Sequence, residues 1–217
     1  MNPVRKGSGW EHLLVIARIE GLKRAYTWNP AVGCHGIGCE VKKRGVCWAE
    51  KFAKRFKIDF TPHLIPERLK DPYRLKKSAV ITPVSMGDLF GLEPQHTEAI
   101  LNVIRDCSWH KFAILTKLPQ NALKFNPFPS NVWFGVSVNL QDDVWRLDCL
   151  KRVEAPRKYV LFEPLYSAIN YDLSWLDLIV IGCQSYPTVQ PKKEWVESIL
   201  RNSGSAKVFF KSNLKPI

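Results

Sequence analysis

Short, continuously apolar runs alternate along this chain with stretches of helical periodicity, and this alternation limits its possible folds more than any other feature. The apolar runs lie at 79–84, 112–115, 132–138, 159–162, 178–181 and 208–210. Strands buried on both faces of a parallel sheet are apolar at successive positions in this way. Apolar residues at helical spacing lie between these runs at 94–110, 141–153 and 193–202, and a strand at 25–28 with a helix at 48–56 begins the series.

A repeated strand–helix–strand pattern implies parallel pairing through right-handed crossovers. We therefore expect an α/β fold with a mostly parallel sheet, a partial (β/α) barrel, with an open doubly wound sheet as the alternative. The length of 217 residues suits a single domain over 1–217, with 1–24 as an N-terminal extension. Pro83 lacks a donor for the ladder, so the strand that contains it is expected to end early or to bulge.

Polar residues follow the predicted strands at the point where each strand ends. In a parallel barrel these ends meet at one mouth, where active sites form. The candidates there are Met86, Gly87, Asp88, Lys117, Ser137, Asn139, Glu163, Gln184, Lys211 and Asn213. Any strand must leave the core through polar residues, so a single candidate is weak evidence for a functional site. The group as a whole is stronger evidence for a pocket.

Three of the six cysteines fall within fourteen residues, at Cys34, Cys39 and Cys47. Glycines between them let the backbone bend so that three thiolates can converge. A zinc site needs a fourth ligand, and the local candidate, His35, is adjacent to Cys34 and poorly placed to share its ion. A cubane iron–sulfur cluster instead uses three thiolates and leaves one iron open. Thiolates suit both metals, so zinc remains the alternative.

The charge balance indicates an anionic partner. Lys+Arg number 32 against 20 Asp+Glu, a net charge of +12. Twelve basic and four acidic residues lie between Lys42 and Lys77. Such a segment favours a nucleic acid or nucleotide partner, although a solvated lysine-rich face has the same composition. With no apolar run of about 18 residues and no signal-peptide pattern, we expect a cytoplasmic protein without a membrane segment.

Several short motifs occur in a fixed order. They are Thr27-Trp28-Asn29-Pro30, Gly33-Cys34, Cys47-Trp48-Ala49-Glu50, then SMGDLF at 85–90, LTK at 115–117, NVWFGVSV at 131–138, FEPL at 162–165 and IVIG at 179–182. In this order they resemble the phage-type three-Cys-motif family, a largely uncharacterised family regarded as related to radical S-adenosylmethionine (SAM) enzymes. The resemblance extends over 27–211, nearly the whole chain.

The resemblance implies a radical SAM-like fold with a [4Fe–4S] cluster on Cys34, Cys39 and Cys47. The open iron would bind SAM, and an electron from an external donor would cleave SAM to a radical that abstracts a substrate hydrogen. The resemblance also places Met86, Gly87 and Asp88 at the amino group of SAM and Ser137 and Asn139 at its ribose. Lys117, Glu163 and Gln184 remain as catalytic candidates that contact the substrate.

Two functions follow. The leading hypothesis is an iron–sulfur, radical SAM-like enzyme that modifies or repairs nucleic acid or a nucleotide. The alternative is a nucleic-acid-binding protein with a structural iron–sulfur or zinc centre and no SAM chemistry. The alternative draws on the cysteine gaps of four and seven residues, where radical SAM enzymes usually have three and two, and on Cys183-Gln184 in place of a glycine–glutamate pair.

Overall fold

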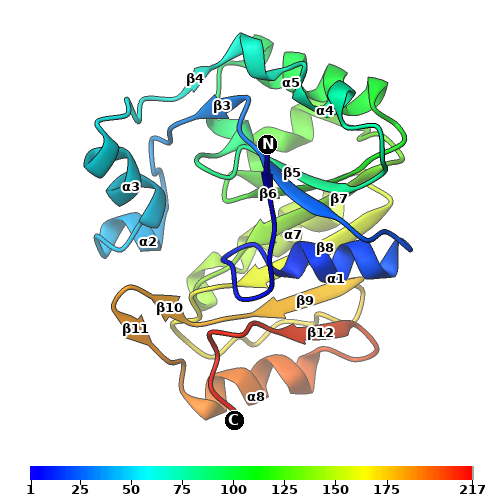
Figure 1. Cartoon of the computed structure of the whole chain (residues 1–217). Coiled ribbons are helices and arrows are strands. Elements are labelled where there is room, and N and C mark those ends of the chain that lie inside the picture. Colours follow the sequence, from blue (N-terminus) through cyan, green and yellow to red (C-terminus); the bar gives the residue numbers. More distant parts are fainter. Residues whose placement is uncertain (217) are drawn as a thin grey trace.

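The central sheet of the computed structural model, which describes residues 1–216, has eight strands in the order β1-β2-β5-β6-β7-β8-β9-β12 (Figure 1). Their bounds are β1 Asn2–Pro3, β2 Ala25–Trp28, β5 Val80–Pro83, β6 Lys111–Thr116, β7 Val132–Ser137, β8 Arg157–Phe162, β9 Leu178–Ile181 and β12 Lys207–Phe210. Neighbours from β2 to β12 pair in parallel, and β1 is antiparallel to β2. The predicted α/β class with a mostly parallel sheet is confirmed.

The sheet is open and does not close into a barrel, because its order runs from β1 to β12 without a pairing between the two ends. From β2 onward the order in space follows the order along the chain. A doubly wound sheet reverses its order at a switch point, and this sheet has no such reversal. The doubly wound alternative is therefore excluded, and the fold is an open, singly wound parallel sheet.

Helices and short hairpins complete the fold. The helices are α1 His12–Ile19, α2 Glu40–Lys43, α3 Trp48–Phe56, α4 Asp71–Arg74, α5 Pro94–Asp106, α6 Pro119–Ala122, α7 Trp145–Arg152 and α8 Lys193–Asn202. The hairpin strands are β3 Ala31–Val32 with β4 His63–Leu64, and β10 Gln184–Ser185 with β11 Thr188–Val189. No helix within residues 1–216 has the length and apolar character needed to cross a lipid bilayer.

Two hydrophobic clusters cover the two faces of the sheet. On one face, alternate strand residues such as Phe134 and Ile179 pack with apolar residues of α5, α7 and α8. On the other face, the intervening residues, among them Trp133 and Tyr159, pack against Leu13 and Ile16 of α1. Every residue of β7 is buried, as its continuous apolar sequence predicts.

The N-terminal segment is integrated into this core. Its strand β1 pairs with β2, and α1 lies in the hollow of the curved sheet (Figure 1). Glu20, directly after α1, accepts a hydrogen bond of 2.8 Å from the indole Nε1 of Trp133. The segment predicted as an extension thus forms one layer of the domain.

The strand that contains Pro83 ends early, as predicted. β5 stops at Pro83, and Val84 takes a left-handed conformation with φ of 54°. A β-branched residue rarely adopts this conformation. It turns the chain out of the sheet, so that residues 85–88 lie beyond the strand ends.

Candidate functional site

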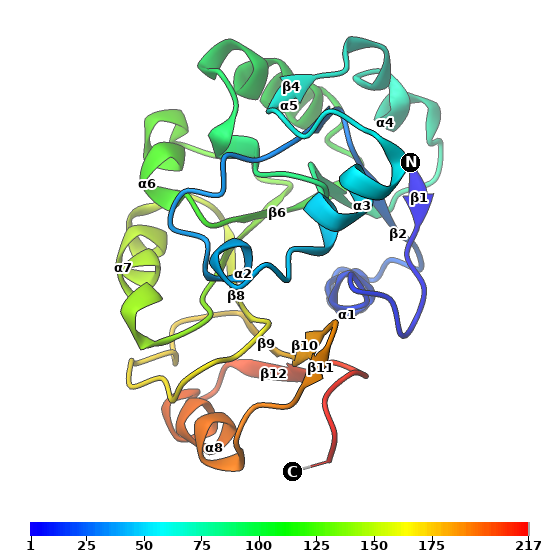
Figure 2. The ribbon, with the colours of Figure 1, turned by 90° about the vertical axis from the view of Figure 1, so that its left-hand side faces the viewer.

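A loop carrying the three clustered cysteines lies beyond the carboxyl ends of the parallel strands (Figure 2). It leaves β3, includes α2 and ends at α3, and its start is fixed to the end of β5. The Gly33 N–H donates to Met86 O at 3.0 Å, and Gly33 forms a parallel bridge with Gly87. A Cβ at Gly87 would lie 2.4 Å from Gly33 O, so this approach requires glycine.

The three cysteines occupy comparable positions in this loop. All are half-buried free thiols. Cys39 and Cys47 immediately precede α2 and α3. The Cys34 thiol accepts a hydrogen bond of 3.2 Å from Gly36 N. Burial raises the pKa of Cys34, and the nearby charges of Asp88 and Cys39 raise it further. A bound metal reverses this effect because a coordinated thiol is deprotonated.

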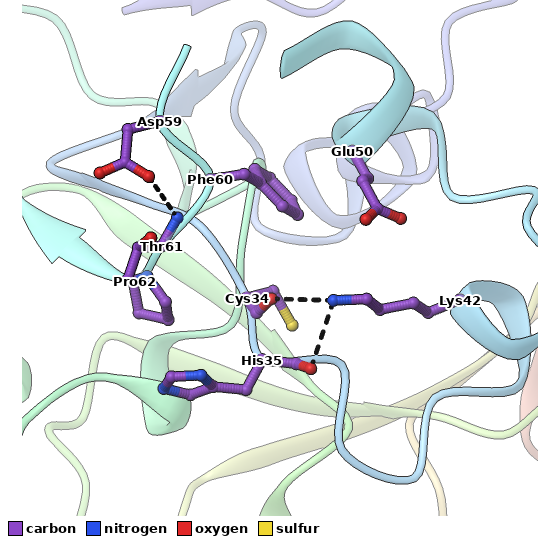
Figure 3. Close-up of a pocket in the computed structure, with 8 residues that line it drawn as sticks. All are labelled: Cys34, His35, Lys42, Glu50, Asp59, Phe60, Thr61 and Pro62. Atoms are coloured by element: carbon purple, nitrogen blue, oxygen red, sulfur yellow. Dashed lines mark hydrogen bonds between the residues drawn. The ribbon is translucent and has the colours of Figure 1, made fainter. Parts of the chain in front are cut away.

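Among the described residues, the three clustered thiols do not form a site for a single metal ion. Within residues 1–216, no three His, Cys, Asp or Glu side chains are close enough together to ligate one metal ion. The His35 imidazole is directed away from the Cys34 thiol (Figure 3), so these two side chains do not face a common ion. In a cubane cluster each thiolate binds a different iron, so the three sulfurs need not meet at one point.

Cys183, a conceivable extra ligand, is engaged elsewhere. It is buried at the end of β9, where its thiol donates to Asn213 O at 2.9 Å and accepts from Gln190 Nε2 at 3.3 Å. These contacts show a thiol packed at a strand end.

A shallow cavity of about 390 Å³, widely open to solvent, lies beside Cys34 (Figure 3). The Lys42 ammonium reaches back across it to Cys34 O at 3.5 Å and His35 O at 3.3 Å. Glu50 and Asp59 also line the cavity, so it carries charges of both signs. It provides space for a polar molecule next to the first cysteine.

Asp88 joins the ends of β5 and β6 from within the protein. Its carboxylate accepts hydrogen bonds from Thr116 Oγ1 at 2.7 Å, Lys117 N at 2.8 Å and Phe90 N at 3.1 Å. Burial raises its pKa, whereas these donors and the charge of Lys117 lower it. Three of roughly four acceptor positions are therefore occupied.

Met86 is likewise held by the protein. Its N–H donates to Asn29 Oδ1 at 3.1 Å, and its carbonyl accepts from the cysteine loop. Met86 and Gly87 thus position the loop, whereas Asp88 joins the ends of β5 and β6. Lys117 follows β6 and is close to Cys34. Its positive charge lowers the pKa of the Cys34 thiol and so partly opposes the increase caused by burial.

Ser137 and Asn139 lie at the end of β7, both buried. Asn139 Nδ2 donates to Pro164 O at 2.7 Å, while Asn139 Oδ1 is buried without a hydrogen-bond partner among the described residues. Ser137 O accepts from Arg146 Nη1 at 3.0 Å. Asn139 Oδ1 is therefore free to accept a hydrogen bond from a bound molecule.

Arg146 of α7 connects this strand end to the cysteine loop. Its second guanidinium nitrogen donates to Gly38 O at 2.8 Å, and Nη1 also pairs with Asp143 at 2.9 Å. Arg146 was not predicted from the sequence as a functional residue. The i,i+3 spacing of Asp143 and Arg146 was the available signal, and it indicates an ion pair rather than a loop contact.

Glu163 and Lys211 form an ion pair at the ends of β8 and β12. Asn213 Nδ2 donates to the other carboxylate oxygen of Glu163 at 3.0 Å, and Lys211 Nζ also donates to Gly9 O at 2.6 Å. Burial raises the pKa of Glu163, and the charge of Lys211 lowers it. The strand-end residues Glu163, Lys211 and Asn213 are therefore brought together as predicted from their positions.

Gln184 is connected to the cysteine loop through a residue that the sequence did not indicate. Its Oε1 accepts from Tyr166 at 2.6 Å, and its Nε2 donates to Pro187 O at 2.8 Å. The guanidinium of Arg44, beside α2, lies 4.3 Å from the centre of the Tyr166 ring. No local pattern marks Tyr166, because its partners are distant in sequence.

These observations define a class of protein. It has an open, singly wound parallel α/β sheet, and a loop with three thiols lies over the carboxyl ends of its strands. The chain belongs to the family described as Protein of unknown function (DUF5131), whose model matches residues 18–213. The match includes the cysteine loop and every strand end described above, and it begins within the last turn of α1. No curated protein and no solved structure matches the chain.

Proposed function

We propose that this protein is an iron–sulfur enzyme of the radical SAM type that acts on nucleic acid or a nucleotide. The observation that carries the proposal is the position of the cysteine loop. Three free thiols lie beyond the carboxyl ends of a parallel sheet, where active sites of such folds form. A loop needed only for connection would not require this set of thiols.

In this proposal Cys34, Cys39 and Cys47 hold a [4Fe–4S] cluster, which when bound supplies the electron for reductive cleavage of SAM. The protein orients the loop through Gly33, Gly87 and Arg146. Asn139 offers a buried amide oxygen to a donor such as a ribose hydroxyl. The cavity beside Cys34 provides space for a polar molecule.

The substrate class is inferred from charge. The molecule carries +12 net charge, and the 42–77 segment beside the thiols has an excess of eight basic residues. A polyanion bound there releases counterions, which makes its affinity strongly dependent on salt. Lys117 and Gln184 remain the candidates for substrate contacts, with Glu163.

The decisive experiment is anaerobic reconstitution with iron and sulfide, followed by electron paramagnetic resonance of the reduced protein with and without SAM. We expect about four irons per chain and a signal that changes when SAM is added. Cys34→Ala, Cys39→Ala and Cys47→Ala should each lose the cluster, while the control Cys149→Ala, at a scattered cysteine on α7, retains it. Lys117→Ala should retain the cluster but weaken activity. Unchanged absorption of Cys47→Ala would contradict the assignment.

A second function is favoured by one specific observation. Several polar groups expected to contact SAM or substrate already have protein partners, among them the Asp88 carboxylate and both polar atoms of the Gln184 amide. This supports a nucleic-acid-binding protein whose metal centre is structural. A reconstituted cluster whose spectrum does not respond to SAM, or zinc as the only metal, would contradict the SAM chemistry and, together with measured oligonucleotide binding, would support this second function instead.

A further inference from the structure

Helix α3 presents its aromatic side chains to solvent and its small side chains to the protein. Trp48, Phe52 and Phe56 are 48%, 40% and 55% exposed, whereas Ala49 and Ala53 are buried. A helix that only stabilises the fold has the opposite arrangement, because burying an aromatic ring is worth more than burying a methyl group. A contiguous exposed aromatic surface of this kind indicates an interaction site.

The three rings form one stripe. They are spaced by four residues, which places them on the same side of a helix, and the rings of Phe52 and Phe56 are 4.5 Å apart between centroids. At 1.5 Å per residue the stripe is about 12 Å long. Trp48 directly follows Cys47, so one end of the stripe adjoins the cysteine loop.

Cations lie along the edge of this stripe. Lys51 and Arg55 are three residues beyond Trp48 and Phe52, so they flank the rings on the same side of the helix. The Arg55 guanidinium lies 5.5 Å from the centre of the Phe56 ring. Neither Lys51 nor Arg55 has an ion-pair partner among residues 1–216.

The acidic side chains nearby do not neutralise these cations. Glu50 is 3.8 Å from Lys54, on the other side of α3, and Glu40 pairs with Arg44 at 2.8 Å. Between residues 40 and 59 the chain has seven basic and three acidic residues, Asp59 included. The surface therefore offers flat aromatic faces together with an uncompensated positive charge.

We propose that the α3 stripe, defined as Trp48, Lys51, Phe52, Arg55 and Phe56, binds single-stranded nucleic acid and leads it to the cysteine loop. The inference deepens the proposed function and rests on its nucleic-acid substrate. Single-stranded binding sites combine stacking rings with cations that follow the backbone. In a duplex the faces of the bases are covered by their neighbours, so exposed rings select single strands.

The test is fluorescence anisotropy with a labelled 12-nucleotide single strand, as DNA and as RNA, and with the same sequence as a duplex. We expect tighter binding of the single strand. Trp48→Ala and Phe52→Ala should each weaken it about 5- to 150-fold, the range for one lost stacking contact. Trp109→Ala is the matched control, since Trp109 is 42% exposed and precedes β6 at the opposite edge of the sheet.

The cations are tested by salt dependence. Lys51→Ala and Arg55→Ala should each reduce the slope of log affinity against log salt by about 0.7, the value for one phosphate contact on a single strand. Lys193→Ala, an exposed lysine on α8, should leave the slope unchanged. All variants change exposed side chains, and circular dichroism should confirm that they fold.

Three outcomes would overturn the inference: equal affinity for duplex and single strand, unchanged binding by the stripe variants, or binding of anionic phospholipid vesicles in place of oligonucleotides. Failure of this inference is separable from failure of the proposed function. Trp48→Ala should load iron as well as the unmodified protein. If oligonucleotide binding depends on the stripe but no cluster forms, the inference stands and the iron–sulfur enzyme does not. If a cluster forms but oligonucleotide binding does not depend on the stripe, only the inference is removed.

Discussion

Glu11 connects the N-terminal segment to the loop after β12. One carboxylate oxygen accepts from Ser212 N at 2.5 Å and the other from Gly7 N at 2.7 Å. Burial alone raises the pKa of Glu11, but these hydrogen bonds and the charge of Lys211 outweigh burial and hold the pKa below its ordinary value of 4.5. The folded protein therefore favours the ionised carboxylate.

From this lowered pKa we predict the pH dependence of Glu11→Gln. A carboxylate with a lowered pKa stabilises the folded state above pH 4.5, and this contribution is lost as the pH falls through the lower, folded-state pKa. At pH 7 the variant should lose about 1.5–3 kcal/mol, the range for hydrogen bonds to a charged group. Urea unfolding at pH 7 and pH 3 should show the two proteins converging at the lower pH. A constant difference across pH, or the same effect in the exposed control Glu154→Gln, would contradict the prediction.

For single residues, the sequence predicted which side chains lie together at the carboxyl ends of the strands, but it did not predict what each side chain contacts. The positions of Asp88, Glu163 and Gln184 after the parallel strands β5, β8 and β9 were sufficient to place them at one edge of the sheet. Their partners were not predictable, because the pairs are distant along the chain. Lys211 and Gly9, for example, are 202 residues apart and meet only when the sheet has formed.

Gly135 allows β7 to pack beside Tyr159 of β8. A Cβ at this position would lie 2.4 Å from the Tyr159 ring, which is fully buried and held by a hydrogen bond to Ile114 O. Gly135→Ala should therefore destabilise the protein by about 1–3 kcal/mol or more through overpacking. Chemical denaturation measures the change, with Gly9→Ala as the control because no atom lies within 4 Å of its added Cβ. Equal stability of the two variants would refute this account of the strand pair.

Arg146 fixes the cysteine loop to α7 and β7. It is 1% exposed and bonds to Ser137 O, Gly38 O and Asp143. Arg146→Ala removes the cation that pairs with the buried Asp143 carboxylate, which keeps only the hydrogen bond from Asn139 N, and takes a donor from two carbonyls, so we expect a loss of about 3–5 kcal/mol. Arg146→Lys keeps the charge but lacks the forked donor, and it should restore only part of the stability. Hydrogen exchange at 33–47 should increase in both variants, and unchanged exchange there would show that the loop is held by other contacts.

Local periodicity predicted the long elements well and the short ones poorly. The expected helix at 193–202 is α8, and the expected strand at 178–181 is β9. The helix expected over 141–153 begins with a 3-10 turn at Gln141–Asp143, and α7 follows from Trp145 to Arg152. The hairpins β3–β4 and β10–β11 have two-residue strands, too short to show any period, and they depend on contacts made by the whole fold.

The position of α1 is the largest difference between expectation and structure for the molecule as a whole. Its sequence, HLLVIARI, is apolar at successive positions and does not show which partner it covers. In an open sheet the hollow face needs a covering layer, because Trp133 and Tyr159 would otherwise be exposed to water. Because the sheet does not close, α1 is buried against its hollow face and completes the core there.

This arrangement predicts that α1 unfolds together with the sheet. Leu13 is fully buried against the hollow face, so Leu13→Ala should cost about 2–5 kcal/mol, while its partly exposed neighbour Leu14→Ala should cost less. Circular dichroism and tryptophan fluorescence should report one coincident urea transition, displaced to lower urea in Leu13→Ala. An independent extension would behave differently, because losing its contacts would leave the midpoint of the main transition unchanged. An unshifted midpoint in Leu13→Ala would therefore show that α1 is a separable appendage, and a shifted one that the open sheet depends on its N-terminal helix for a complete core.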